Sequence, residues 1–228
     1  MIYAIGDLHL SFSNNKPMKV FGNHWNKHYE KIKNDWEARV KEDDLVLIPG
    51  DISWAMKLEE ARKDMEFISR LPGRKILIKG NHDYWWSSLN KVSTMYKDLE
   101  FIQNTSIIYN NIAICGTRGW TCPNKVKFTK DDEKLYLREV NRLEIALKSI
   151  NQPIDKIYVM THFPPTNELF EPSEFTKLYN EYNVDKVIYG HLHGKESFKM
   201  GLQGVRENVE YILVSCDYLN FKLKLIDG

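Results

Sequence analysis

Five short apolar runs along the chain each end in a cluster of polar residues of the same kind. The runs and their endings occupy residues 2–9, 45–51, 76–83, 157–162 and 186–193. Their length and β-branched content predict buried strands, with each polar cluster just beyond the end of its strand. In open sheets, sites collect outside the carboxyl ends of the strands. We therefore expect the five endings to contribute to one site.

Apolar residues recur at helical spacing in the segments between these strands. The pattern predicts helices over residues 25–40 and 58–71, and a third helix that runs to Ile150. The third helix begins near Thr129, which is followed three residues later by Asp132, the spacing of a capping box. Because strands alternate with helices, we expect a largely parallel region.

Two other stretches predict antiparallel strands. Residues 101–115 contain two short strand candidates around Asn110 and Asn111, which is typical of a hairpin. From Phe198 onward the pattern predicts several strands and almost no helix, ending in the alternating segment 221–226. Mixed sheets follow from this combination. No linker or repeat divides the chain, so we expect a single domain over residues 1–228.

Composition and charge exclude some classes of protein. The chain is 43% hydrophobic and 28% charged, and its net charge of +1 argues against binding nucleic acid through a concentrated basic face. No apolar stretch approaches the ~20 residues that span a bilayer, and no signal peptide is visible. Cys115, Cys122 and Cys216 lack paired-ligand spacing. We therefore expect a cytoplasmic protein with reduced thiols and no membrane partner.

The strand endings carry the side chains of a metal site. The candidate ligands are Asp7, His9, Asp51, Asn81, His162, His191 and His193. Imidazole nitrogens mixed with a few oxygens suit manganese, iron or zinc better than magnesium or calcium. Seven ligands are too many for one ion with an open position, but they suit two ions that share a bridging carboxylate.

These residues also resemble a known family. The motifs Asp7-x-His9, Gly50-Asp51, Gly80-Asn81-His82-Asp83, His162 and Gly190-His191-x-His193 are similar, in content and order, to the signature of the calcineurin-like metallophosphoesterases. The resemblance extends from residue 7 to residue 193. It implies an α/β (α+β) fold, a four-layer α-β-β-α sandwich of two mixed sheets with the metal site at the carboxyl ends of the strands.

The resemblance also implies a role for each residue. The first metal would be held by Asp7, His9, Asp51 and His193, and the second by Asp51, Asn81, His162 and His191. Asp51 would bridge two metal ions, with manganese favoured and iron or zinc as alternatives. A metal-bridged hydroxide would attack a phosphomonoester or phosphodiester. His82 would donate a proton to the leaving group, and Asp83 would orient its imidazole and raise its pKa.

Charge favours a phosphoester as the substrate, because two divalent ions outweigh the charges of Asp7 and Asp51. We expect a small substrate, nucleotide-like or another metabolite of modest size. A nuclease acting on DNA or RNA and a non-catalytic scaffold are the alternatives. The weak basic character counts against the first, and the complete motif set counts against the second. A protein phosphatase is doubtful because no Asp-Arg-Gly follows Gly50-Asp51, and Trp54 stands where purple acid phosphatases place a tyrosine ligand.

Some residues have two interpretations. Trp54, Trp85 and Trp86 form an apolar rim around the site, or they pack in the interior. Arg118 binds a substrate phosphate, or it pairs with an acidic residue. The candidate substrate-binding residues are Asn81, His82, Arg118 and Trp54. His24 and His28 lie one helical turn apart, and we expect them at the surface or at the edge of a pocket. The sequence does not indicate an oligomeric state.

Overall fold

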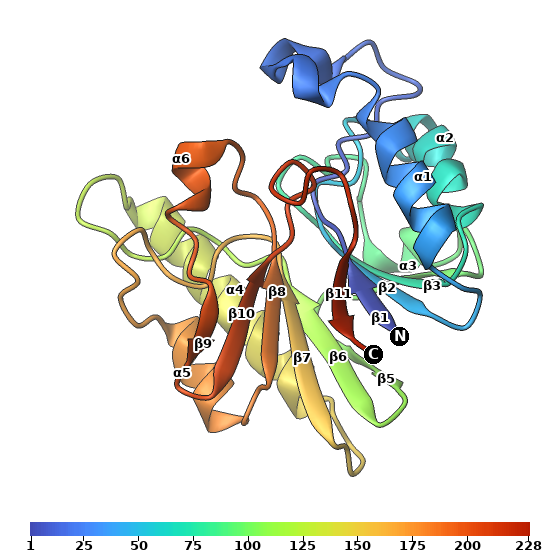
Figure 1. The fold of residues 1–228 in the computed structure, drawn as a ribbon. Coiled ribbons are helices and arrows are strands. Elements are labelled where there is room, and N and C mark those ends of the chain that lie inside the picture. Colours follow the sequence, from blue (N-terminus) through green and yellow to red (C-terminus); the bar gives the residue numbers. More distant parts are fainter.

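The computed structural model describes residues 1–228 and consists of two β-sheets packed face to face, with helices on the outer faces (Figure 1). The first sheet has the strand order β11-β1-β2-β3-β4. Its strands are β1 Ile2–Ala4, β2 Leu45–Pro49, β3 Arg74–Ile78, β4 Leu99–Phe101 and β11 Lys224–Asp227. Strands β1 to β4 run parallel, and β11 is antiparallel to β1.

The second sheet has the strand order β5-β6-β7-β8-β10-β9. Its strands are β5 Ser106–Tyr109, β6 Ile112–Thr117, β7 Lys156–Thr161, β8 Lys186–Tyr189, β9 Gly204–Arg206 and β10 Val209–Leu213. The four central strands are parallel, and the two edge strands are antiparallel to their neighbours. Both sheets are therefore mixed.

Helices complete the outer layers. The α-helices are α1 His28–Arg39, α2 Leu58–Ser69, α3 Leu89–Val92, α4 Lys130–Lys148, α5 Glu174–Glu181 and α6 Lys195–Phe198, and the 3-10 helices are η1 Met18–Phe21 and η2 Asn23–Trp25. Trp36 of α1 and Met65 of α2 pack on the first sheet, whereas Leu143 of α4 packs on the second. A separate core lies between the sheets and contains Ile76 and Met160. This arrangement confirms the four-layer sandwich.

Most of the predicted elements are confirmed. All five strands that precede the polar clusters form, and both faces of each sheet are covered, which explains their almost unbroken apolar runs. Helix α4 begins with the expected capping box: Thr129 Oγ1 accepts from the Asp132 backbone N–H at 3.1 Å, and Asp132 accepts from the Thr129 N–H at 3.0 Å. Asn110 and Asn111 have φ values of 48° and 60°, which suit the tight turn of the β5–β6 hairpin.

Several boundaries differ from the prediction. The apolar residues near position 101 form β4, which belongs to the first sheet and not to the hairpin. The helix expected from Trp25 begins at His28, because Trp25 belongs to the separate turn η2. Helix α5 was not expected at all. None of the helices combines the length and the apolar character that crossing a membrane requires. The three cysteines are buried and unpaired.

Candidate metal centre

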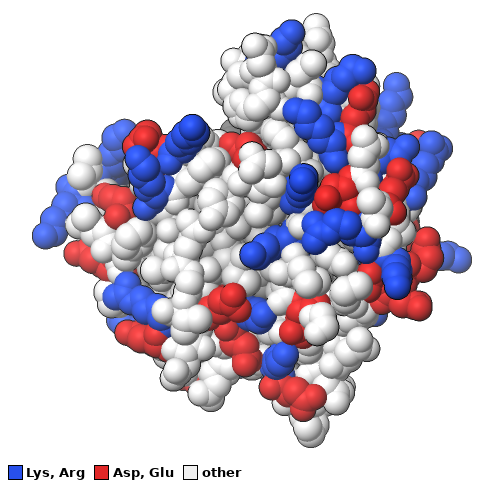
Figure 2. All heavy atoms as spheres, in the orientation of Figure 1, with Lys and Arg blue, Asp and Glu red and all other residues white.

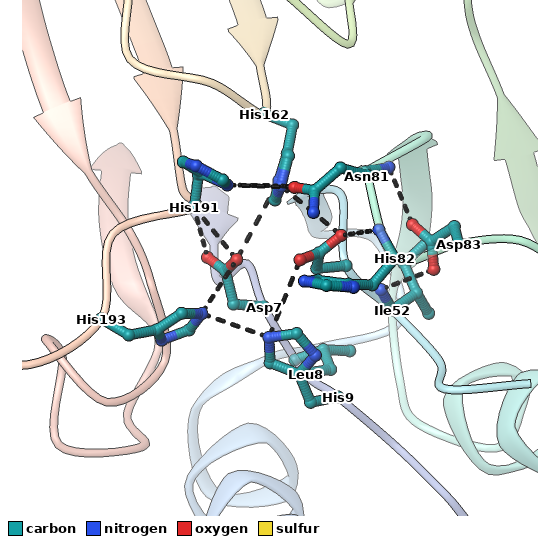
Figure 3. A network of polar contacts seen from close by, with 12 residues as sticks. Asp7, Leu8, His9, Ile52, Asn81, His82, Asp83, His162, His191 and His193 are labelled. Carbon is teal, nitrogen blue, oxygen red and sulfur yellow. Dashed lines mark hydrogen bonds and ion pairs between the residues drawn. The ribbon is translucent and has the colours of Figure 1, made fainter. Parts of the chain in front are cut away.

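The ends of five parallel strands meet at one edge of the sandwich, and the candidate ligands lie there (Figure 3). Strands β1, β2 and β3 of the first sheet lead into the segments with Asp7, His9, Asp51 and Asn81. Strands β7 and β8 of the second sheet lead into those with His162, His191 and His193. The structure thus brings together all seven residues that the sequence predicted as ligands.

One group of side chains forms around His9. Its Nε2 lies 3.1 Å from the Nε2 of His193 and 3.8 Å from Oδ2 of Asp51. The Nε2 of His193 also lies 3.5 Å from Oδ1 of Asp7. Asp7, His9 and His193 are close enough together to hold one cation.

A second group forms around His162. Its Nε2 lies 2.7 Å from Oδ1 of Asn81, 3.2 Å from Nδ1 of His191 and 3.4 Å from Oδ1 of Asp51. The Nδ1 of His191 lies 3.0 Å from the same Asn81 oxygen. Asp7, Asp51 and His162 are also close enough to hold a cation. Asp7 therefore belongs to both triads, while the two oxygens of Asp51 face one histidine of each group.

The hydrogen bonds of two histidines indicate that the centre fits metal ions. Nδ1 of His162 lies 3.0 Å from the carbonyl oxygen of Pro49, and Nδ1 of His193 lies 2.9 Å from the Asp217 carboxylate. Because both oxygens accept, each Nδ1 carries a proton, and Nε2 is the ring nitrogen that is directed inward. The two inward nitrogens face the Asn81 oxygen and the His9 nitrogen. A proton or a metal cation between such pairs of electron-pair donors removes their repulsion.

The electrostatics of the four histidines are consistent with this fit. Burial lowers the pKa of His9 to about 4 and that of His191 to about 3, which keeps both rings neutral and able to ligate. Burial opposes the charged form of His162 too, but the Asp51 carboxylate raises its pKa to about 9. His193 behaves in the same way, because hydrogen bonds to carboxylates outweigh burial and raise its pKa to about 10. His162 and His193 therefore carry protons at the ring nitrogens from which a metal ion would displace them.

The backbone at the centre is strained and closely packed. Four ligand residues have left-handed conformations: Asp7 (φ 57°), His9 (φ 45°), Asp51 (φ 50°) and His191 (φ 72°). Such conformations are costly outside glycine and concentrate at functional sites. Gly80 and Gly190 allow the loops to approach, because a Cβ atom at Gly190 would collide with the Asp7 carboxylate and one at Gly80 with Asp51.

His82 lies beside the ligands but is held differently from the prediction. Its backbone N–H donates to Oδ1 of Asp51 at 2.8 Å, and its ring lies 5.9 Å from the ring of His9 and 4.5 Å from that of Trp54. Its imidazole makes no hydrogen bond to another side chain. Burial lowers the pKa of His82, although Asp51 opposes this effect. The expectation that Asp83 raises this pKa is therefore wrong for this structure.

Asp83 holds the ligand loops together and does not orient His82. The buried carboxylate accepts hydrogen bonds from the backbone N–H groups of Ile52 (2.9 Å), Ser53 (3.1 Å) and Gly80 (2.8 Å), and from the Trp85 indole (3.0 Å). No hydrogen bond joins this carboxylate to the His82 ring. Burial, reinforced by the charge of Asp51, raises the pKa of Asp83 to about 6.

A groove of about 300 Å³ opens over the centre. Trp54 forms part of its wall and stacks on the ring of His9, with centroids 4.8 Å apart and planes inclined by 19°. Trp85 and Trp86 are each 1% exposed and belong to the core of the first sheet. The interpretation as an apolar rim therefore applies to Trp54, and it is wrong for the other two.

Arg118 lies outside the groove. Its guanidinium stacks on the Trp120 ring at 4.6 Å, and one of its nitrogens lies 3.6 Å from Oε1 of Glu139. The expected contact with a substrate at the metal centre is thus not supported. The backbone oxygen of Arg118 still contributes to the centre, because it accepts from the N–H of His162 at 2.9 Å and so helps fix that ligand.

The sequence reasoning missed several contributors. Asp217 orients His193 and also accepts from the Gly194 N–H at 3.1 Å. The sequence contained a signal for Asp217, because this residue follows the apolar strand β10 just as the candidate ligands follow their strands. His24 lies at the edge of the groove, as expected. The same expectation is wrong for His28, which is buried. Its Nε2 lies 2.8 Å from the carbonyl oxygen of Leu8 and so supports the segment between Asp7 and His9.

Comparison with known proteins identifies the family. A family model described as calcineurin-like phosphoesterase matches residues 1–195. The chain belongs to this family. Members of the calcineurin-like phosphoesterase family are metal-dependent, in agreement with the clusters of candidate ligands in this chain. A search of curated proteins gave no match.

Solved structures share the fold of this family member. Phosphopantetheinyl hydrolase from Mycobacterium tuberculosis is 14% identical, with 100% of this chain and 96% of that chain covered and a TM-score of 0.64. A protein of unknown function from Aquifex aeolicus is 17% identical, with 98% and 94% covered and a TM-score of 0.54. A Thermus thermophilus protein is 11% identical, with 85% and 82% covered and a TM-score of 0.51.

Proposed function

We propose that this chain hydrolyses the phosphoester of a small molecule that carries an apolar or aromatic group. The observation that supports this proposal most strongly is a groove with aromatic walls that is lined by two of the candidate ligands, His9 and His193, and by His82. The family supports metal-dependent phosphoester hydrolysis. The groove suggests the class of substrate.

In this proposal Asp7, His9, Asp51 and His193 hold one metal ion, and Asp51, Asn81, His162 and His191 hold a second. When bound, divalent ions would neutralise the phosphoryl oxygens and lower the pKa of an attacking water. The imidazole-rich set of ligands favours manganese, iron or zinc. Pro49 and Asp217 accept from Nδ1 of His162 and His193, so a metal ion would bind the inward Nε2 of each ring in place of a proton.

His82 is proposed to donate the proton to the leaving group. Its ring lines the groove, and no side chain of the protein competes for its nitrogens. Trp54 packs against both His82 and His9 and so fixes the position of the proton donor relative to the ligands. Asn81 and His82 are the proposed contacts for the phosphoryl group, because His82 lines the groove and Asn81, the preceding residue, lies beside the ligands His162 and His191.

The remaining wall of the groove suits an apolar substituent. Met18, Phe21 and Trp25 line it together with Trp54, and no lysine or arginine does so. A groove that takes a nucleic acid needs positive charge along the phosphate backbone, and none is found there. Figure 2 shows lysine and arginine interspersed with aspartate and glutamate over the visible face, without a broad basic area. A nuclease is therefore not favoured.

Neighbouring residues on helix η1 provide a test. Phe21 lines the groove and is 63% exposed, whereas Val20 is 75% exposed and does not line it. In metal-loaded protein, Phe21→Ala should lower kcat/KM for 1-naphthyl phosphate about five- to tenfold, and Val20→Ala should not change it. For glycerol 2-phosphate, which has no aromatic group, neither substitution should change kcat/KM. Methyl 1-naphthyl phosphate, a phosphodiester with the same aromatic group, shows in the same assay whether the chain hydrolyses diesters.

Two results would contradict the proposal. If no naphthyl ester were hydrolysed with manganese, iron or zinc, the reaction itself would be wrong. If both esters were hydrolysed but Phe21→Ala and Val20→Ala had equal effects, the reaction would stand and the assignment of the groove to an apolar substituent would fail.

A further inference from the structure

A second cavity of about 210 Å³ is lined by basic side chains and lies apart from the groove. Its basic residues are Lys79, Arg118, Arg138 and Arg142. No acidic side chain lines it, and it shares no lining residue with the groove over the metal centre. Lys79 follows β3, Arg118 follows β6, and the other two arginines lie one turn apart on α4. Three separate elements thus direct positive charge into one cavity.

The arginines share a single carboxylate as their counter-ion. Oε1 of Glu139 lies 2.7 Å from Arg142, 3.1 Å from Arg138 and 3.6 Å from Arg118, measured to guanidinium nitrogens. Its other oxygen accepts from the hydroxyl group of Thr117. The Glu139 side chain is 0% exposed, and its hydrogen-bonding capacity is used. This carboxylate therefore cannot neutralise the whole cluster.

Positive charge remains in excess in the cavity. Four cationic side chains line the cavity, and Glu139 is the only carboxylate in ion-pair contact with any of them. The Nζ of Lys79 donates to the neutral backbone oxygen of Trp86 at 2.7 Å, and the charge of Asp83 acts on Lys79 without an ion-pair contact. Like charges held this close destabilise one another unless an anion joins them.

The donors in the cavity are also preorganised for an anion. Stacking on Trp120 fixes the plane of the Arg118 guanidinium, and its Nε is buried without a hydrogen-bond partner. Guanidinium groups match the oxygen pairs of phosphate through two parallel hydrogen bonds. A carboxylate would add only one negative charge to the cluster, whereas a phosphate group carries close to two.

We propose that this cavity is a binding site for a phosphate group, separate from the metal centre. The ligand is inorganic phosphate or the phosphate group of a small metabolite, held by Arg118, Arg138, Arg142 and Lys79. The proposal does not depend on the reaction at the metal centre, because it rests on side chains that do not line the groove.

Arginine side-chain NMR tests the site directly. The full chain, loaded with diamagnetic zinc, is titrated at low salt with inorganic phosphate, and the Nε–Hε signals are followed. The signals of Arg118, Arg138 and Arg142 should shift and saturate, while that of the exposed Arg70 should not. Methylphosphonate is the second probe, because its methyl group occupies the position of the organic substituent in a phosphate ester. Equal binding of both probes indicates that the site accepts a phosphate group of a metabolite, and binding of phosphate alone indicates the free ion.

Substitutions then measure the contribution of the cluster. Arg138 is 47% exposed, and its removal leaves Glu139 with two arginine partners. Arg138→Gln should weaken phosphate binding about tenfold, Arg138→Lys should stay within about threefold of the wild type, and Arg70→Gln should have no effect. Lys79→Gln, which leaves every Glu139 contact in place, should also weaken binding. The proposal is overturned if the three arginine signals do not shift, or if Arg138→Gln and Lys79→Gln bind phosphate as the wild type does.

Discussion

The ring nitrogen that each histidine turns inward decides what the centre can bind. His162 is fixed by a backbone carbonyl oxygen, which no substitution removes, but His193 is fixed by the side chain of Asp217. The second contact can therefore be changed alone. Such outer contacts orient a ligand and increase its basicity, so they affect metal affinity without touching the ion.

Asp217→Asn should weaken metal binding at the site that contains His193. The amide oxygen can still accept from Nδ1, but the loss of the negative charge makes the imidazole a poorer ligand. We expect about a 10- to 100-fold loss of affinity for one ion and little change for the other, measured by competition with a chelator. Asp155→Asn, an exposed substitution, is the control. Unchanged affinity for both ions would show that Asp217 does not support the centre.

His82 can be tested as a proton donor through the basicity of the leaving group. His82→Ala should lower kcat for an alkyl phosphoester by ~10²–10⁴-fold, and much less for a nitrophenyl ester, whose leaving group departs without a proton. Metal content must match the wild type. His24→Ala, at the edge of the same groove, should show no such dependence. Equal losses on both esters would mean that His82 binds the phosphoryl group or holds the loop instead.

At the scale of elements, helix α2 is linked to the loops that carry the ligands. Asp64 accepts from the Phe12 N–H at 2.9 Å and from the hydroxyl of Ser53, two residues after Asp51. Burial raises the pKa of this carboxyl group, although both hydrogen bonds oppose the shift. The charged form is therefore destabilised in the folded protein.

The stability of the wild type relative to Asp64→Asn should depend on pH. An acid whose folded pKa exceeds its unfolded value of about 3.9 stabilises the fold below that value, and the contribution is lost as the pH rises through the folded pKa. The asparagine mimics the protonated acid. The unfolding free energy of Asp64→Asn minus that of the wild type should thus increase from pH 4 upward and then level off, as measured by urea denaturation. A flat or falling difference would contradict this account.

The sequence predicted the elements with long, regular patterns and missed short or context-dependent ones. The strands before the ligands were clear because both their faces are buried. Helix α5 has only eight residues, yet Phe175, Leu178 and Tyr179 show helical spacing and Ser173 caps it, so a signal was available. The η2 turn at Trp25 has no comparable pattern.

The same limit applies to the site. The candidate ligands could be placed together because all seven follow the ends of five buried strands. The role of Asp83 could not, since it depends on the backbone of Ile52 and Ser53, far away in the sequence. The sequence could not decide between the two interpretations of Arg118 for a similar reason. The acidic partner, Glu139, comes from α4, and only the packing of that helix on β6 brings the two residues together.

At the scale of the whole molecule, the two sheets supply different halves of the centre. Asp7, His9, Asp51 and Asn81 come from the first sheet, and the remaining three histidines come from the second. The core between the sheets, with Ile76 and Met160, sets their separation and hence the distances between ligands. The central claim is that this interface holds a pair of ions bridged by Asp51.

Metal content tests that claim most directly. Elemental analysis of protein reconstituted with manganese and freed of excess metal should give two ions per chain in the wild type. Asp51 faces a histidine of each group, so Asp51→Asn should empty both sites, while Asp7→Asn should mainly affect one. If Asp51→Asn retained two ions per chain, the account would be contradicted. It would also be contradicted if Asp7→Asn alone lost both ions, because Asp7 belongs to both triads and would then be the bridge.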